Sequence, residues 1–98
     1  MAKATARAAG AVAGVLRTVG LAIVAVLVLY IALTLLQANP ANVAAALIAR
    51  LAATFDLGLS NLFLVADPML SVVLNYGAAA LVWLLITVVV VRLVSRVG

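Results

Sequence analysis

The sequence predicts an all-α fold: an integral membrane two-helix hairpin with an interfacial amphipathic helix in the connecting loop. Hydrophobic residues make up 70% of the 98 residues and charged residues 8%. A soluble domain of this size could not keep so much apolar surface away from water. The few charged residues leave two long uncharged stretches, which a more polar connector separates. We therefore expect one membrane module over residues 1–98.

The first uncharged stretch covers residues 18–37. About 20 helical residues at ~1.5 Å each span roughly 30 Å, the thickness of the hydrocarbon core. The stretch is longer than the apolar region of a signal peptide, and residues 36–40 make a poor cleavage site. We predict a first membrane span here. A basic, weakly amphipathic lead helix over residues 1–17 should continue into it.

The connector, residues 38–67, carries a helix signal of its own. Asn39 and Pro40 predict an N-cap and a first helical residue. From there, apolar side chains recur at every fourth position: Val43, Leu47, Leu51 and Phe55. This spacing predicts an amphipathic helix over residues 41–56, which is too short and too polar on one side to span. We expect it in the outer interface, with its apolar stripe facing lipid or the spans.

The second uncharged stretch begins with a similar start signal, Asp67 followed by Pro68. An acidic N-cap suits the positive end of the helix dipole, and Pro is favoured at the first helical position. The uncharged residues that follow are numerous enough to cross a bilayer with some tilt. We predict a second span over residues 68–91 and a basic tail over residues 92–98.

The positions of the basic residues predict the orientation. Only Arg50 lies in the connector, and the other five basic residues flank the spans: Lys3, Arg7, Arg17, Arg92 and Arg96. The positive-inside rule then places both termini in the cytoplasm and residues 38–67 outside. Arg outnumbers Lys five to one and Ala, Val and Leu dominate, which indicates a GC-rich bacterial genome. We expect a multi-pass protein of a bacterial cytoplasmic membrane.

Two faces are candidate helix-packing sites, because small residues let helix backbones approach closely in a membrane. On the first helix, small residues recur at every fourth position: Gly10, Gly14, Thr18 and Ala22. An Ala-rich chain also produces such a stripe by chance. On the second span, three candidates share a face: Ser71, Asn75 and Ala78. An Asn within a span needs a hydrogen-bond partner, either on another helix or subunit, which we favour, or in water or the loop.

The composition excludes most catalytic chemistry. His and Cys are absent, which removes the commonest general base, the commonest metal ligands and thiol nucleophiles. We interpret the connector charges Arg50, Asp56 and Asp67 as capping or solvated groups. Neither predicted span contains Asp, Glu, Lys or Arg, whereas proton and ion pathways usually need such groups. We therefore expect no enzyme activity, catalytic residue, cofactor, metal site, small-molecule substrate or nucleic-acid partner.

The order of a span, Asn39-Pro40, an amphipathic helix, an acidic residue followed by Pro, and a second span resembles one repeat of the YggT family. The resemblance rests on Asn39-Pro40 and residues 48–69, which is under half of the chain. It departs from the family pattern over residues 57–66, which contain neither Pro nor Arg. The resemblance implies a stand-alone membrane-organising protein.

The sequence favours a small non-catalytic membrane protein, an auxiliary or structural subunit that packs against a larger membrane complex. Its partners would be the lipid bilayer and other membrane subunits, or copies of itself. Two alternatives stay open: a self-assembling holin-like or pore-forming protein, and the YggT-like role. The pore is disfavoured because neither predicted span has a polar stripe that could line water.

Overall fold

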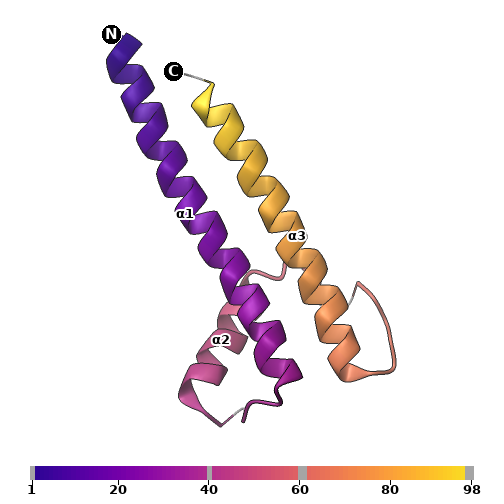
Figure 1. Cartoon of the computed structure of the whole chain (residues 1–98). Coiled ribbons are helices and arrows are strands. Elements are labelled where there is room, and N and C mark those ends of the chain that lie inside the picture. The colour runs from indigo at the N-terminus through magenta and orange to yellow at the C-terminus, as the bar shows by residue number, and fades with distance from the viewer. Residues whose placement is uncertain (1, 40, 60–61, 97–98) are drawn as a thin grey trace.

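A computed structural model describes residues 2–39, 41–59 and 62–96. These residues form three helices, α1 (Ala2–Leu35), α2 (Val43–Thr54) and α3 (Pro68–Ser95). The long helices α1 and α3 pack antiparallel along their length, and the shorter α2 lies beside α1 (Figure 1). The predicted all-α hairpin with a middle helix is confirmed. We call the end where α1 begins and α3 finishes the basic end, and the opposite one the connector end.

The first helix is continuous from the basic lead into the predicted span. It ends at Leu35, two residues before the predicted end of the span. The Ala38 N–H donates to the Leu33 carbonyl and the Gln37 N–H to the Thr34 carbonyl. With Gln37 at φ 54°, these bonds form a Schellman motif, which pairs the last carbonyls of the helix. The apolar pattern could not indicate this stop, because Gln37 occupies a position that usually holds Gly.

The middle helix, predicted over residues 41–56, begins two residues later, at Val43, and ends at Thr54. Asn42 is its N-cap, and the Asn42 Oδ1 accepts from the N–H groups of Ala44 and Ala45 at 2.9 and 3.3 Å. The Asn39 Oδ1 instead accepts from the Ala41 N–H, so Asn39 forms a turn ahead of the helix. The predicted cap was therefore wrong by one turn, because two Asn residues three positions apart both suit this role. Pro40 lies outside the described residues.

The third helix starts as predicted. Asp67 is its N-cap, with its Oδ1 accepting from the Met69 N–H at 2.9 Å, and Pro68 is the first helical residue. The helix continues to Ser95, so residues 92–95 of the predicted tail are helical. At ~1.5 Å per residue α3 is roughly 42 Å long, and α1 is longer. Both exceed what a bilayer core requires.

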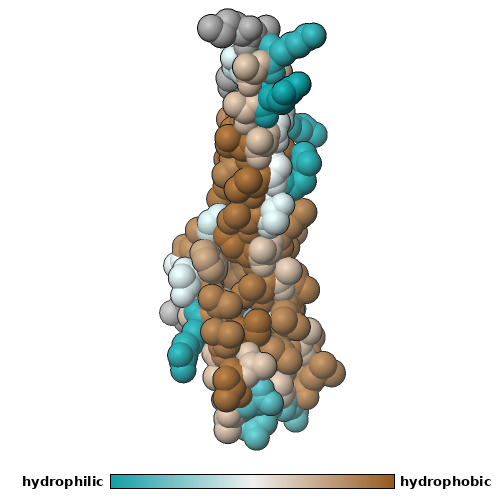
Figure 2. All heavy atoms as spheres, turned by 90° about the vertical axis from the view of Figure 1, so that its left-hand side faces the viewer, coloured by the Kyte–Doolittle hydropathy of each residue, from teal (hydrophilic) through white to brown (hydrophobic). Residues whose placement is uncertain are grey.

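The buried core is small and lies where all three helices meet. It consists of five residues: Ile23, Leu27, Ala52, Ala79 and Ala80. Most of the other side chains of α1 and α3 are exposed, although both helices are strongly apolar. Figure 2 shows this as a broad hydrophobic band with hydrophilic groups gathered at the two ends of the rod. Two long, apolar and mainly exposed helices indicate a small two-span membrane protein.

Candidate functional site: packing faces and polar anchors

The two long helices lie in close contact at Gly20. A Cβ atom built on Gly20 would overlap the Thr87 side chain, with its Cγ2 at 2.6 Å and its Cβ at 2.8 Å. Thr87 is itself buried, and its hydroxyl donates to the Trp83 carbonyl of the same helix at 2.7 Å. Only a residue without a side chain fits at this contact. Gly20 therefore sets the distance between the spans.

The face of α1 that packs against α3 follows a heptad-like spacing. The covered residues of this face are spaced alternately by four and three positions: Ala9, Ala13, Leu16, Gly20, Ile23 and Leu27. All are buried except Leu16, which is half-buried. This alternation is the spacing of antiparallel helix pairs that cross at a shallow angle. It was visible in the sequence, but apolar residues cover every side of α1 and hid it.

The predicted small-residue stripe of α1 lies on a different side of the helix. Gly10, Thr18 and Ala22 are exposed and Gly14 is half-buried. A Cβ atom added to either glycine of the stripe would have no neighbour within 4 Å. The structure therefore does not bring these four residues to α3. Their role in packing against another chain stays a prediction.

Asn75 fixes the connector to α3. Its side chain is 1% exposed, its Oδ1 accepts from the Phe63 N–H at 2.6 Å, and its Nδ2 donates to the Phe63 carbonyl at 3.2 Å. The Nδ2 also donates to the Ser71 Oγ at 3.0 Å. The hydrogen bonds to the loop are therefore observed, and among the described residues Asn75 bonds no side chain or backbone group of another helix. A contact with another subunit stays a prediction. Ala78, the third predicted residue of this face, is half-buried and lines an apolar groove between α1 and α3.

Trp83 makes a second anchor that sequence reasoning missed. Its indole Nε1–H donates to the carbonyl of Phe55, the C-cap of α2, at 2.8 Å. The two rings also meet edge to face, with centroids 6.0 Å apart. A lone Trp in the middle of an apolar span is an unusual place for an interfacial anchor, and this was the available signal. Its partner could not be identified from the sequence, because 28 residues separate the two groups.

These anchors place the connector alongside the spans and not across their end. Asn75 and Trp83 lie seven and fifteen residues beyond Pro68, so at ~1.5 Å per residue they are roughly 10 and 22 Å from the start of α3. Asn75 holds the backbone of Phe63 near the first level, and Trp83 holds the backbone of Phe55 near the second. Non-helical backbone at such depth needs protein partners for its polar groups. The two α3 side chains supply them.

The turn that follows the C-terminal end of α2 is organised by Asp56. Its Oδ1 accepts from the Gly58 N–H and its carbonyl from the Leu59 N–H, both at 2.9 Å. Leu57 and Gly58 both have positive φ, at 57° and 74°, so the chain reverses direction there. Asp56 thus has a turn-forming role, which agrees with the capping interpretation of the connector charges.

The packing face of α2 is formed mainly by alanines, and Phe55 of the predicted stripe packs against the same core. Ala52 is fully buried, and Ala45, Ala46 and Ala49 are partly covered. The opposite face carries four exposed residues: Val43, Leu47, Arg50 and Thr54. No carboxylate among the described residues pairs with the Arg50 guanidinium. The small alanines let α2 approach α1 closely, and the larger stripe residues are left partly or fully exposed.

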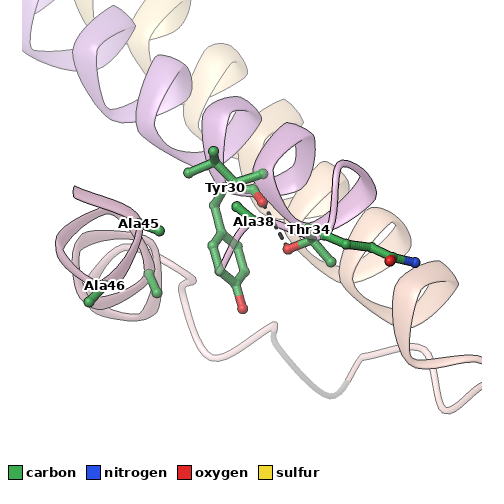
Figure 3. A pocket seen from close by; sticks show the side chains of 8 residues that line it. Tyr30, Thr34, Ala38, Ala45 and Ala46 are labelled. Atoms are coloured by element: carbon green, nitrogen blue, oxygen red, sulfur yellow. Dashed lines mark hydrogen bonds between the residues drawn. The ribbon is translucent and has the colours of Figure 1, made fainter. Parts of the chain in front are cut away.

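A cavity of about 440 Å³ lies between α1 and α2 near the connector end. Figure 3 shows the Tyr30 ring extending from α1 into the space beside α2, and the Thr34 hydroxyl donating back to the Tyr30 carbonyl. Gln37 is the only other polar side chain of its described lining, and the rest is aliphatic. The cavity therefore offers neutral hydrogen-bonding groups. Within the described residues no group of acidic, His or Cys side chains could hold a metal ion.

Comparison of the chain with protein-family models, curated proteins and solved structures finds no match. The similarity to a YggT repeat therefore rests on the residues quoted above. The fold and its contacts define a class: a small two-span membrane hairpin whose connector is anchored alongside the spans.

Trp83→Phe should loosen the inner end of α2 without unfolding the hairpin. The substitution keeps the ring contact and removes the donor to the Phe55 carbonyl, which costs about 1 kcal/mol. We expect faster amide hydrogen exchange in residues 52–57. Tyr30→Phe is the matched control, because it also removes one polar group from a partly buried ring, and no described residue hydrogen-bonds its hydroxyl. Equal exchange in both variants would contradict the anchor.

Proposed function

We propose that this chain is a non-catalytic accessory subunit of a larger membrane protein complex, docked through the outward face of α2. The observation that carries this proposal is the position of Arg50. It is exposed, and it precedes Phe55 by five residues, so it lies within about 8 Å of the depth at which Trp83 holds the end of α2. The neighbouring stretches of both long helices are uncharged.

An arginine at this level is poorly suited to lipid. Insertion scales give roughly 2.5–3.5 kcal/mol for a charged side chain at the centre of a spanning helix, and such residues usually face protein or water. A partner that offers a carboxylate or several carbonyl oxygens at the same depth would remove this cost. Val43 and Leu47 on the same face would give that partner apolar contact.

The polar groups of α3 favour this function over a pore. Asn75 and Thr87 are buried inside the chain, and both are hydrogen-bonded there. Ser71 is half-buried against Asn75. The outward side of α3 carries Leu81, Leu85 and Leu93, all exposed. A ring of copies that lined water with this helix would present leucine to the channel.

The orientation of the chain in the membrane follows from the basic residues that flank the two spans. We propose that the basic end lies in the cytoplasm of a bacterial cell and the connector end outside, in keeping with the positive-inside rule. A reporter that is active only in the cytoplasm, fused after residue 98, should be active. The same reporter inserted after Asn39 should be inactive. The reverse result would contradict this orientation.

Site-specific photo-crosslinking in native membranes tests the docking face. A photoreactive residue at Ala53, which is exposed on α2, should give one dominant adduct with a larger membrane protein. The same residue at Leu85 on α3 should not give this adduct. Arg50→Leu should abolish it, whereas Arg96→Leu, the matched loss of one positive charge at the basic end, should not.

Two other outcomes would contradict the proposal. A ladder of homo-oligomers from Ala53 would favour the self-assembling alternative. Adducts with lipid alone would favour a stand-alone protein whose Arg50 reaches the headgroups.

A further inference from the structure

The basic end contains a groove between α1 and α3 that combines two arginines with an apolar floor. Its volume is about 240 Å³, and Arg17 from α1 and Arg92 from α3 both line it. The remaining lining residues that matter here are aliphatic: Leu21, Leu84, Val88 and Val91. From Leu84 to Arg92 the groove extends along eight residues of α3, roughly 12 Å at ~1.5 Å per residue.

The groove lies beside the tight contact between Gly20 and Thr87. Thr87, which also lines the groove, packs against Gly20, and its hydroxyl donates a hydrogen bond to the Trp83 carbonyl. Val91 is almost fully buried, whereas Leu21 and Val88 are about half exposed. The lining therefore offers an apolar trough, with Arg17 and Arg92 on its side toward the basic end.

The positive charge around the groove is not neutralised by acidic residues at the same end of the chain. Five of the six basic residues of the chain belong to the basic end, and both acidic residues, Asp56 and Asp67, belong to the connector. Figure 2 shows hydrophilic side chains clustered at that end of the rod, next to the hydrophobic band. Two arginines that share a groove repel each other unless an anion lies between them, and the guanidinium group matches phosphate geometry.

We propose that this groove binds one anionic phospholipid. The phosphate lies between Arg17 and Arg92, and the first methylene groups of one acyl chain lie along Leu21, Leu84 and Val88. Basic pockets between membrane helices on the cytoplasmic side suit such headgroups. The site uses neither α2 nor Arg50, so it stands whether or not the accessory-subunit proposal holds.

The test is lipid binding by the purified full chain in mild detergent, measured by native mass spectrometry. Phosphatidylglycerol should bind with higher occupancy than phosphatidylcholine, and glycerol phosphate without acyl chains should not bind. Arg17→Gln and Arg92→Gln should each weaken phosphatidylglycerol binding about fivefold, which corresponds to the energy of one basic residue at an anionic membrane surface. Arg7→Gln and Arg96→Gln remove the same charge outside the groove and should leave binding unchanged.

A groove-filling variant tests the apolar half of the site. Val88→Phe keeps both arginines and should also lower phosphatidylglycerol binding, because the larger ring occupies the trough. Equal losses in Arg96→Gln and Arg17→Gln would overturn the proposal in favour of general charge attraction. Equal binding of phosphatidylcholine, binding of glycerol phosphate alone, or unchanged binding by Val88→Phe would each overturn it as well.

Discussion

Gly20→Val should separate the two long helices and strongly destabilise the hairpin. Even a lone Cβ at this position would overlap Thr87, and a β-branched side chain adds two more carbons to the overlap. Overpacked cores lose about 1–3 kcal/mol, and the close approach of membrane helices depends on small residues at such contacts. Unfolding in increasing dodecyl sulfate, followed through the fluorescence of the single Trp83, measures the effect.

Two other helical glycines provide matched controls. Gly14→Val on α1 and Gly77→Val on α3 make the same chemical change in a helix, and a Cβ at either position would meet nothing within 4 Å. Both should unfold close to the parent protein. If all three variants lost the same stability, helix propensity would explain the result and the close contact would not. The double variant Gly20→Ala with Thr87→Gly should be more stable than the sum of the two single changes predicts.

Asn75→Leu should release the connector from α3. The substitution removes three hydrogen bonds and leaves the N–H and carbonyl of Phe63 without their partner. An unsatisfied buried polar group costs about 1–3 kcal/mol, so we expect a loss of about 2–4 kcal/mol. Hydrogen exchange at the Phe63 amide and protease cleavage within residues 62–66 should both become faster.

Ser71→Ala separates the contribution of the Ser71 hydrogen bond from that of the two bonds to Phe63. It removes only the hydrogen bond between Ser71 and Asn75 and leaves both contacts of Asn75 with Phe63 in place. Its effect should be about 1 kcal/mol or less, with little change at the Phe63 amide. Unaltered protection of Phe63 in Asn75→Leu would show that other contacts hold the connector.

The elements of this fold that could be predicted are those that are specified by residues close to one another in the sequence. Two uncharged stretches of bilayer length predicted α1 and α3, and the Asp67-Pro68 pair predicted the start of α3 to the residue. Each of these features depends on side chains that are close in sequence to the structure they specify. The middle helix was also predicted, because its apolar spacing repeats over several turns, although its cap was assigned to the wrong Asn.

The contacts between elements could not be predicted in the same way. Asn75 was recognised as a residue that must find a partner, but nothing near it in the sequence identifies Phe63, twelve positions away. The packing side of α1 was missed because lipid and protein both accept apolar side chains. Hydrophobicity therefore does not distinguish an inward face from an outward one in a membrane. The one decisive residue, Gly20, differs from Gly10 and Gly14 only in what lies opposite.

The location of both anchors on the last helix has a consequence for how the protein is made. Asn75 and Trp83 leave the ribosome after the whole connector has been synthesised, so α2 has no hydrogen-bond partner on α3 while α1 is being inserted. The middle helix α2 can therefore dock in its final position only after α3 has packed against α1. Translation stalled ahead of residue 83 would leave a chain with its first helix inserted and its connector undocked.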